Sequence, residues 1–217
     1  MNIREWILHL LFPPRCILCR KVLKKNETDL CRECRIDSPE YPHLKRKIQF
    51  LDSFTAVWYY ESNVRKSLLR YKFYGARGYA SSYGLLLAMK LRKEYPDDFD
   101  VLTWVPVSRL RRLQRGYDQV ELLAHAVGRE LELPPVSVLK KIRHNRQQSR
   151  IRDAAKRRAN VLGAYRVINP DEIRGKRVLL LDDIYTTGST VSECARMLLT
   201  EGAKEVHCAA VAAARKR

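Results

Sequence analysis

The distribution of apolar residues changes its period repeatedly along the chain. Short runs rich in β-branched and aromatic residues predict strands, and the four most distinct are Phe54–Tyr60, Val101–Val107, Val178–Asp183 and Glu205–Ala212. Apolar residues three and four positions apart predict helices at Ser62–Tyr71, Tyr79–Tyr95, Asp118–Leu131 and Ser189–Thr200. Strands that alternate with helices are typical of an α/β protein whose parallel sheet is covered by helices on both faces.

The remaining segments are less regular. Short strands are expected at Val136–Leu139 and Tyr165–Ile168, on either side of a basic stretch. Residues 3–11 have the spacing of a short amphipathic helix, and Pro39 and Pro42 indicate irregular chain. We therefore expect an N-terminal module, a linker and an α/β domain, over residues 1–38, 39–50 and 51–217 respectively.

Four of the six cysteines form two closely spaced pairs, Cys16 with Cys19 and Cys31 with Cys34. Four thiolates with this spacing suit tetrahedral Zn²⁺, and the arginines and lysines beside them favour the deprotonated thiol. Two disulfides are the alternative, which a cytoplasmic location disfavours. Because four thiolates leave no open coordination position, we expect Zn²⁺ to stabilise a small zinc-ribbon-like module and to perform no chemistry.

Charge is concentrated in one part of the sequence. The net charge is +18, and residues 101–170 hold 15 basic against 5 acidic side chains. Such a field attracts polyanions, although a solvated basic surface that aids solubility is the simpler alternative. The hydrophobic content of 46% excludes wholesale disorder. No apolar run approaches the ~20 residues of a membrane span, and no signal cleavage site follows residues 3–12, so we expect a cytoplasmic protein.

The most specific pattern is the segment Val178–Thr190. It consists of an apolar strand, the adjacent carboxylates Asp182 and Asp183, and a turn that leads into a helix. Helix N-termini attract phosphate, and hydroxyls surround this one; the turn residues are Thr186, Thr187, Gly188, Ser189 and Thr190. The carboxylates would repel a phosphate but would accept hydrogen bonds from a sugar diol, so the pattern predicts a ribose 5-phosphate site at the carboxyl end of a strand.

This segment closely resembles the phosphoribosyl pyrophosphate (PRPP) signature of type I phosphoribosyltransferases. A wider resemblance, over roughly residues 12–212, is to ComF-type competence proteins. It is carried by the start Pro13–Cys16 and by several internal segments, Leu69–Gly75, Trp104–Val107, Arg112–Gln119, Arg146–Gln148 and Arg157–Val161. The resemblance implies a type I phosphoribosyltransferase-like parallel sheet flanked by helices, PRPP bound with Mg²⁺, and a role in natural transformation in which single-stranded DNA is handled in the cytoplasm.

The resemblance also suggests roles for individual residues. Asp182 and Asp183 are the candidate catalytic groups, acting through the ribose hydroxyls on a transition state with oxocarbenium character. Thr186 to Thr190 would hold the 5-phosphate. The turn that meets pyrophosphate would be formed by Val107, Ser108 and, by family analogy, Arg109.

The basic residues around these segments exceed what one small substrate needs, because Lys140–Arg158 alone contains nine of them. A nucleic-acid phosphate backbone is the kind of partner that could use all of these charges. The candidate DNA-binding residues are Arg111, Arg112, Arg115, Lys140, Lys141, Arg143, Arg146 and Arg150. Aromatic residues lie near this charge at Tyr71, Phe73, Tyr74 and Tyr117, where unpaired bases would stack on them, although Tyr71 and Phe73 are equally compatible with the core.

No segment of the sequence identifies the group that would accept the phosphoribosyl moiety. The favoured hypothesis is therefore a protein that binds PRPP and single-stranded DNA, with other competence or DNA-import proteins as further partners. Transferase turnover is left open. The alternatives are a metabolic phosphoribosyltransferase acting on a nucleobase or amine, and a zinc-ribbon adaptor on a catalytically silent scaffold.

Overall fold

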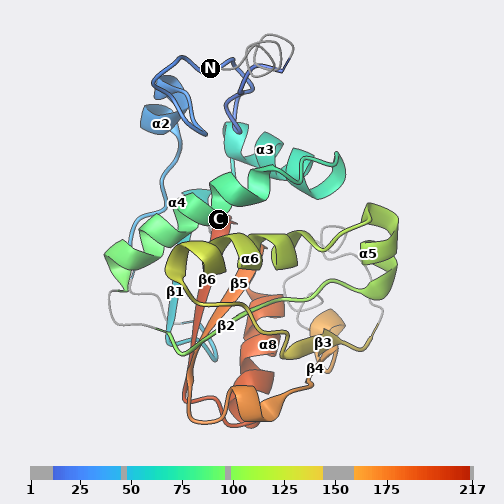
Figure 1. Cartoon of the computed structure of the whole chain (residues 1–217). Coiled ribbons are helices and arrows are strands. Elements are labelled where there is room, and N and C mark those ends of the chain that lie inside the picture. The colour runs from blue at the N-terminus through green and yellow to red at the C-terminus, as the bar shows by residue number, and fades with distance from the viewer. Residues whose placement is uncertain (1–11, 45–47, 96–98, 144–158, 216–217) are drawn as a thin grey trace.

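A four-stranded parallel sheet forms the centre of the molecule. The computed structural model describes residues 12–44, 48–95, 99–143 and 159–215. The strand order is β1-β6-β5-β2 (Figure 1), and the strands are β1 (Ser53–Tyr59), β2 (Val101–Trp104), β5 (Arg177–Tyr185) and β6 (Glu205–Ala213). The apolar run of β5 lies between β2 and β6 because both faces of a parallel sheet are buried.

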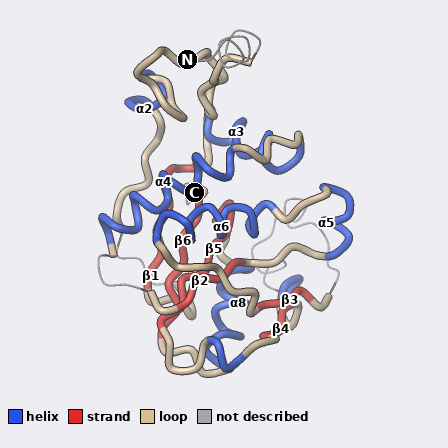
Figure 2. Tube along the Cα trace, viewed as in Figure 1, coloured by secondary structure: helices blue, strands red, loops and turns tan. Residues whose placement is uncertain are grey.

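Helices cover both faces of this sheet, as the alternating pattern predicts (Figure 2). One face carries α3 (Ser62–Phe73), α4 (Tyr79–Glu94) and α6 (Gln119–Leu131), and the other carries α8 (Ser189–Thr200). Successive residues of β5 contribute alternately to the two cores: Leu179 and Leu181 face the first group of helices, whereas Val178 and Leu180 face α8. The predicted α/β architecture is confirmed.

The helix α5 (Arg109–Arg115) and the two short strands β3 (Leu139–Lys141) and β4 (Tyr165–Val167) differ from the predictions. The helix α5 was not predicted, because none of its residues is buried and its sequence carries no apolar stripe. The strands β3 and β4 pair with each other in antiparallel orientation, outside the parallel sheet. The 3₁₀ turn η2 (Pro170–Glu172) then leads into β5.

The N-terminal module contains the helix α2 (Arg32–Asp37) and packs on the outer side of α3 (Figure 1). Its residues Ile17 and Leu18 belong to the same buried cluster as Leu68 of α3. Arg70 of α3 donates hydrogen bonds to the carbonyls of Ile17 and Leu18, over 2.9 and 2.6 Å. The module therefore rests on the helices of the sheet domain, with one side of α3 as its support.

Part of the segment expected as a linker pairs with β1. Tyr41 is buried, its N–H donates to the carbonyl of Val57 over 3.0 Å, and the Tyr59 N–H donates to the Pro39 carbonyl over 2.7 Å. The helix expected over residues 3–11 lies outside the described residues. Among the residues described, none of the helices has the length and apolar character needed to cross a bilayer.

Candidate functional site

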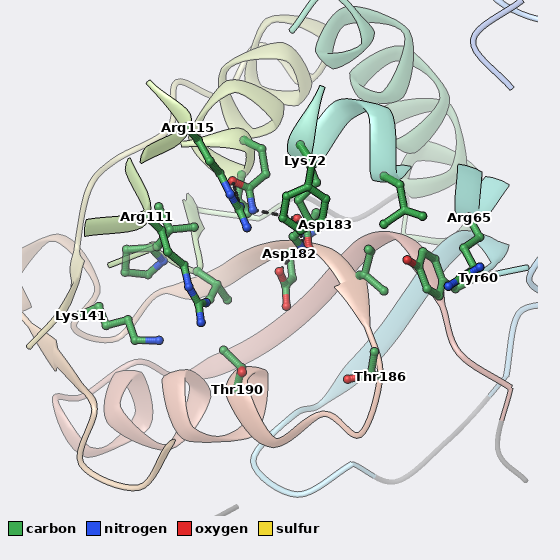
Figure 3. Close-up of a pocket in the computed structure, with 18 of the residues that line it drawn as sticks. Tyr60, Arg65, Lys72, Arg111, Arg115, Lys141, Asp182, Asp183, Thr186 and Thr190 are labelled. Carbon is green, nitrogen blue, oxygen red and sulfur yellow. Dashed lines mark hydrogen bonds and ion pairs between the residues drawn. The ribbon is translucent and has the colours of Figure 1, made fainter. Parts of the chain in front are cut away.

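A cavity of about 470 Å³ lies at the carboxyl edge of the sheet (Figure 3). The carboxylates Asp182 and Asp183 line its floor, where β5 approaches its end. Thr186, from the turn that follows β5, and Thr190, in the first turn of α8, line one side. Side chains from α3, from the loop after β2, from α5 and from β3 complete the wall. The structure thus brings the predicted acidic pair and the predicted phosphate turn to one space, as expected where strands end in an open α/β sheet.

Asp183 is held by two partners that arrive from distant parts of the sequence. The Lys72 ammonium of α3 lies 2.9 Å from Oδ1 and 2.8 Å from Oδ2 of Asp183. The Gln119 side-chain amide, at the start of α6, donates to Oδ2 over 2.9 Å. Burial by itself raises the pKa of Asp183, but the Lys72 charge and these hydrogen bonds outweigh it and lower the pKa below its ordinary value. Asp183 is therefore an ionised carboxylate with both oxygens engaged.

Asp182 has the opposite electrostatic environment. Burial, and then the negative charge of Asp183, raise the pKa of Asp182 to about 8. Its Oδ1 accepts the backbone N–H of Asp183 over 2.8 Å. Neighbouring carboxylates whose pKa values are driven apart in this way are typical of functional sites. One member of the pair is charged at neutral pH, and the other is poised to gain or lose a proton.

The phosphate turn takes its shape from Gly188. This residue precedes α8 and has a φ of +78°, in the left-handed region. A Cβ at this position would lie 2.4 Å from the Tyr185 hydroxyl oxygen and 2.7 Å from the adjacent ring carbon. Only glycine avoids both the unfavourable φ and this contact. The hydroxyls of Thr187 and Ser189 are hydrogen-bonded to each other at 2.9 Å, which holds the turn together at the helix N-terminus.

The side of the cavity opposite the turn is cationic. Arg111 of α5 and Lys141 of β3 extend into the cavity facing Thr190, as Figure 3 shows. Within the described part of the chain, neither residue forms an ion pair with a carboxylate. Burial and the nearby Arg111 charge lower the pKa of Lys141 to about 8. Two cations without acidic partners, facing a helix N-terminus, form a site suited to an extended polyanion.

The predicted pyrophosphate residues have different positions. Val107 lines the cavity, but its N–H donates to Oδ2 of the buried Asp118 over 3.1 Å. Ser108 caps the short helix α5 and is buried, whereas Arg109 is exposed at the start of that helix. The turn at 107–108 is thus occupied with internal hydrogen bonds, while Arg111, one turn further along, faces the cavity.

The predicted DNA-binding residues divide into three groups. Arg111, Arg115 and Lys141 line the cavity. Three others are exposed outside the cavity lining: Arg112, which pairs with Glu121 at 3.3 Å; Lys140, on the other side of β3 from Lys141; and Arg143, which bonds to the Leu162 carbonyl at 3.3 Å. Arg146 and Arg150 lie outside the described residues.

The candidate aromatic residues divide as well. Tyr71 and Tyr117 are buried, so Tyr71 takes the core position that was left open for it, and the interpretation of Tyr117 as a stacking surface is wrong. The Tyr71 hydroxyl donates to the Gln119 carbonyl, and the Tyr117 hydroxyl donates to the Tyr71 carbonyl, so both rings support the local backbone. Phe73 and Tyr74 are 49% and 78% exposed, and the Arg115 guanidinium lies 4.8 Å from the centre of the Phe73 ring. These two rings are available to a ligand.

Sequence reasoning missed Lys72 and Gln119 as site residues. Both fall in segments that carry the family resemblance, which is the only signal they give. No local pattern connects Lys72 with a carboxylate 111 positions further along the chain.

The four predicted zinc ligands converge at one point in the N-terminal module. The Sγ atoms of Cys16, Cys19, Cys31 and Cys34 all lie within 4.8 Å of one another. A tetrahedral site with Zn–S bonds of about 2.3 Å has sulfur atoms roughly 3.8 Å apart, so the set fits a structural Zn²⁺. Burial raises the pKa of the Cys16 thiol, but backbone N–H groups around its sulfur outweigh burial and lower the pKa to about 7. Cys194 and Cys208 are buried in the sheet domain, as predicted.

The acidic pair does not fit a directly bound Mg²⁺ in the same way. Mg²⁺ requires open oxygen ligands in near-octahedral geometry. Both oxygens of Asp183 are engaged by Lys72 and Gln119, and one oxygen of Asp182 accepts a backbone N–H. An ion at Asp183 would have to displace the Lys72 ammonium.

Comparisons with known proteins agree with this arrangement. Residues 121–217 match the family described as "Phosphoribosyl transferase domain", and residues 7–43 match "Double zinc ribbon domain". The chain is 26% identical to "Competence protein F" of Haemophilus influenzae, over 88% of this chain and 93% of that protein. It is 28% identical to "Competence protein ComFC" of Bacillus subtilis, over 86% and 78%. It is also 26% identical to the "DNA utilization protein YhgH" of Escherichia coli, over 88% and 86%.

Proposed function

Because this chain is a ComF-type protein, with a phosphoribosyltransferase-like domain behind a four-cysteine module, we propose that it binds PRPP and handles single-stranded DNA in the cytoplasm during natural transformation. The relatives named for competence and for DNA utilization support the role in DNA uptake. The observation that carries the PRPP part is the convergence of three features on one cavity: the acidic pair, the hydroxyl-lined turn and the unpaired cations.

The chemistry of these three features matches the three parts of PRPP. The turn at Thr186–Thr190 would bind the 5-phosphate through backbone N–H groups and hydroxyls. Asp182 would accept hydrogen bonds from the ribose hydroxyls on the cavity floor. Arg111 and Lys141 would bind the pyrophosphate on the opposite side, in place of the turn at 107–109. Mg²⁺, predicted together with PRPP, would take its oxygen ligands from PRPP and water.

Titration calorimetry with PRPP tests this part. Asp182→Asn and Arg111→Ala are each expected to weaken PRPP binding about tenfold or more, since the first replaces a carboxyl oxygen that would accept from a ribose hydroxyl and the second removes a charge that would contact the pyrophosphate. Arg129→Ala is the matched control, because Arg129 is an exposed arginine of α6 outside the cavity. Unchanged PRPP affinity in both cavity variants would contradict the proposal.

The DNA part is supported by a second cavity, of about 300 Å³, that opens beside the first. It shares Lys72, Phe73, Arg111 and Arg115 with the PRPP cavity, and Gly75, Gln114 and Tyr117 complete its lining. Cations beside exposed rings are what an unpaired strand binds, because phosphates pair with the cations and bases stack on the rings. In this proposal the strand passes over Phe73 and Tyr74, and other DNA-import proteins would deliver it.

Fluorescence anisotropy of a labelled oligothymidylate tests the DNA part. Phe73→Ala and Tyr74→Ala are each expected to weaken binding about five- to hundredfold, the range of a lost stacking contact of ~1–3 kcal/mol. Met89→Ala removes an equally exposed apolar side chain from α4 and is the control. Arg111→Ala should also make the dependence of log K on log[salt] shallower, by about 0.7 for one phosphate contact. An oligothymidylate affinity that does not change with salt concentration would contradict this part.

Phosphoribosyl transfer would be a further step. A metabolic phosphoribosyltransferase would release pyrophosphate from PRPP when its nucleobase or amine acceptor is supplied. Release with one compound of a panel of bases and amines would favour that alternative. Tight PRPP binding without release would leave a PRPP-binding protein of DNA uptake.

A further inference from the structure

Lys72 occupies a position in the cavity that nothing in the carboxyl-terminal signature predicts. It lies in the last turn of α3. Its ammonium reaches across to β5 and contacts both oxygens of Asp183 at 2.8 and 2.9 Å, and the two side chains are 23% and 5% exposed. A bidentate contact between groups this well enclosed has little solvent screening, unlike an ion pair on the surface.

A hydrogen-bond network fixes this ion pair from the other side. Gln119 donates to Oδ2 of Asp183 over 2.9 Å, and its own Oε1 accepts from Arg115 over 2.8 Å. The backbone carbonyl of Gln119 accepts the buried Tyr71 hydroxyl. Each polar atom of the Gln119 side chain thus has an assigned partner. The amide cannot rotate to release Asp183 without breaking its bond to Arg115.

The consequence is that Asp183 presents neither oxygen to a ligand. A metal ion that bound there would have to displace an ammonium from both oxygens, or sit beside it at short distance with like charge. The ammonium itself lines the cavity beside Asp182 and so supplies a positive charge to the floor. The ammonium has three N–H donors and contacts two oxygens of Asp183, so one donor is left for a phosphate oxygen of a ligand in the cavity.

We propose that Lys72 is a built-in cation that takes the place of a divalent metal ion at Asp183, so that Asp182 is the carboxylate that meets the ligand. The metal half of this inference, that Lys72 keeps a divalent ion from Asp183, is independent of the proposed function. Its ligand half, that Asp182 and Lys72 meet the ligand, rests on PRPP binding. Lys72 is in these terms a positioning residue for Asp183 and an electrostatic partner for the phosphates.

Binding of Mn²⁺, followed by electron paramagnetic resonance of the full-length zinc-loaded chain without PRPP, tests the metal half. The wild type is expected to show no Mn²⁺ binding that depends on Asp183. Lys72→Met should create a site between the two carboxylates and bind Mn²⁺ at least tenfold more tightly than the wild type. Adding Asp183→Asn should remove that gain, and Lys72→Arg should show none. Lys66→Met is the control, because Lys66 is an exposed lysine on the same helix that does not line the cavity.

Two results would overturn the inference. One is Asp183-dependent Mn²⁺ binding by the wild type, and the other is a folded Lys72→Met variant that gains no Mn²⁺ affinity. Circular dichroism establishes whether the variant folds. If it does not fold, the comparison of wild type with Asp183→Asn decides alone, since equal Mn²⁺ binding by the two supports a closed Asp183 and a difference refutes it.

Calorimetry with PRPP tests the ligand half. The wild type is expected to bind PRPP in EDTA with at most a few-fold loss of affinity relative to Mg²⁺ buffer. Lys72→Met should lose at least tenfold more than the wild type when the metal is removed. Equal metal dependence in the two proteins would overturn the ligand half. Failure of both proteins to bind PRPP in any buffer would instead refute the proposed function, and the Mn²⁺ result would still stand.

Discussion

The cysteine module and the cavity are both clusters of reactive side chains, but they are built in opposite ways. In the module, four sulfur atoms converge within 4.8 Å of one another, and three of the four cysteines are buried. In the cavity, acidic, basic and hydroxyl groups line an open space of about 470 Å³. A convergent set with no open position suits a structural ion, whereas a divergent set around a space suits a ligand that comes and goes.

The two regions also differ in whether their charged side chains have ion-pair partners. The module pairs its own charges at short range, as where Lys21 meets Glu33 near the cluster. The cavity leaves Arg111 and Lys141 without carboxylate partners within the described residues, and it holds Asp182 at a raised pKa. Groups kept in such an environment cost stability in the free protein, a cost that is typical of functional sites.

The largest effect is expected from breaking the convergent site. Cys31→Ser should lower the zinc content from about one ion per chain and reduce the free energy of unfolding by more than ~3 kcal/mol, because metal binding is coupled to folding. Zinc analysis and chemical denaturation measure both. Cys194→Ser is the control: it alters a cysteine in the other core cluster and should cost about 1–3 kcal/mol with zinc retained. A Cys31→Ser protein with normal zinc and stability would show that the cluster is not a metal site.

Next in size is Gly188→Ala in the phosphate turn. The new Cβ meets both a φ of +78° and the Tyr185 ring, so we expect a loss of about 2–5 kcal/mol in urea denaturation, together with loss of PRPP binding. Gly175→Ala is a matched control, because Gly175 has a similar φ of +69° but nothing within 4 Å of the added Cβ. It should cost only about 1–2 kcal/mol. Equal costs for the two variants would mean that the contact with Tyr185 does not shape the turn.

A smaller effect is expected from the pH dependence of Asp182. The folded protein retains the Asp182 proton up to about pH 8, while an unfolded aspartate loses it near pH 3.9. The retained proton therefore favours the folded state fully below about pH 4, and this contribution to the free energy of unfolding is lost as the pH rises from about 4 through 8. Asp182→Asn should flatten this part of the stability curve and raise the free energy of unfolding at pH 8 by about 1–3 kcal/mol. Identical pH profiles for the two proteins would contradict the assigned environment.

The smallest effect concerns Lys141. Because its pKa is lowered to about 8, its charge is present below that pH and fades above it. Affinity for inorganic pyrophosphate, measured by calorimetry, should fall severalfold between pH 7 and pH 9. Lys141→Arg should lose less, since arginine keeps its charge. Asp182→Asn separates the contribution of the carboxylate, which gains negative charge over the same range. A Lys141→Arg protein with the wild-type pH profile would exclude Lys141 from the anion site.

How far the sequence predicts the structure depends on whether the signal is local. The strand, the acidic pair, the turn and the helix of residues 178–200 follow one another along the chain, and the structure places them as predicted. The cysteine cluster was equally predictable, because two short spacings define its ligands. The antiparallel pairing of β3 with β4 was not, because it joins segments that are distant in sequence and too short to show a period.

The composition of the cavity wall was predicted less well. Arg111 and Lys141, predicted to contact DNA, line the cavity beside the acidic pair, a position that their sequence context does not indicate. Tyr117 was expected to be accessible and is buried, and Tyr71, for which a core position was the open alternative, is buried as well. Lys72 and Gln119 reach Asp183 only through tertiary packing. Charge and aromatic content identify candidates, but the direction in which each side chain points is fixed by packing between elements.

The helix α3 contacts both the cysteine module and the cavity. Its Ser67 and Arg70 bond to the backbone of the cysteine module, and its Lys72 and Phe73 line the cavity. Both sets of contacts lie on one short stretch of the same helix, so we expect a displacement of the module to change the position of the Lys72 side chain. If metal removal by a chelator weakens the binding of a sugar phosphate, reciprocity requires that a bound sugar phosphate raise the metal affinity of the module by the same factor. Oxidation of the four thiols is then expected to alter ligand binding in the neighbouring cavity.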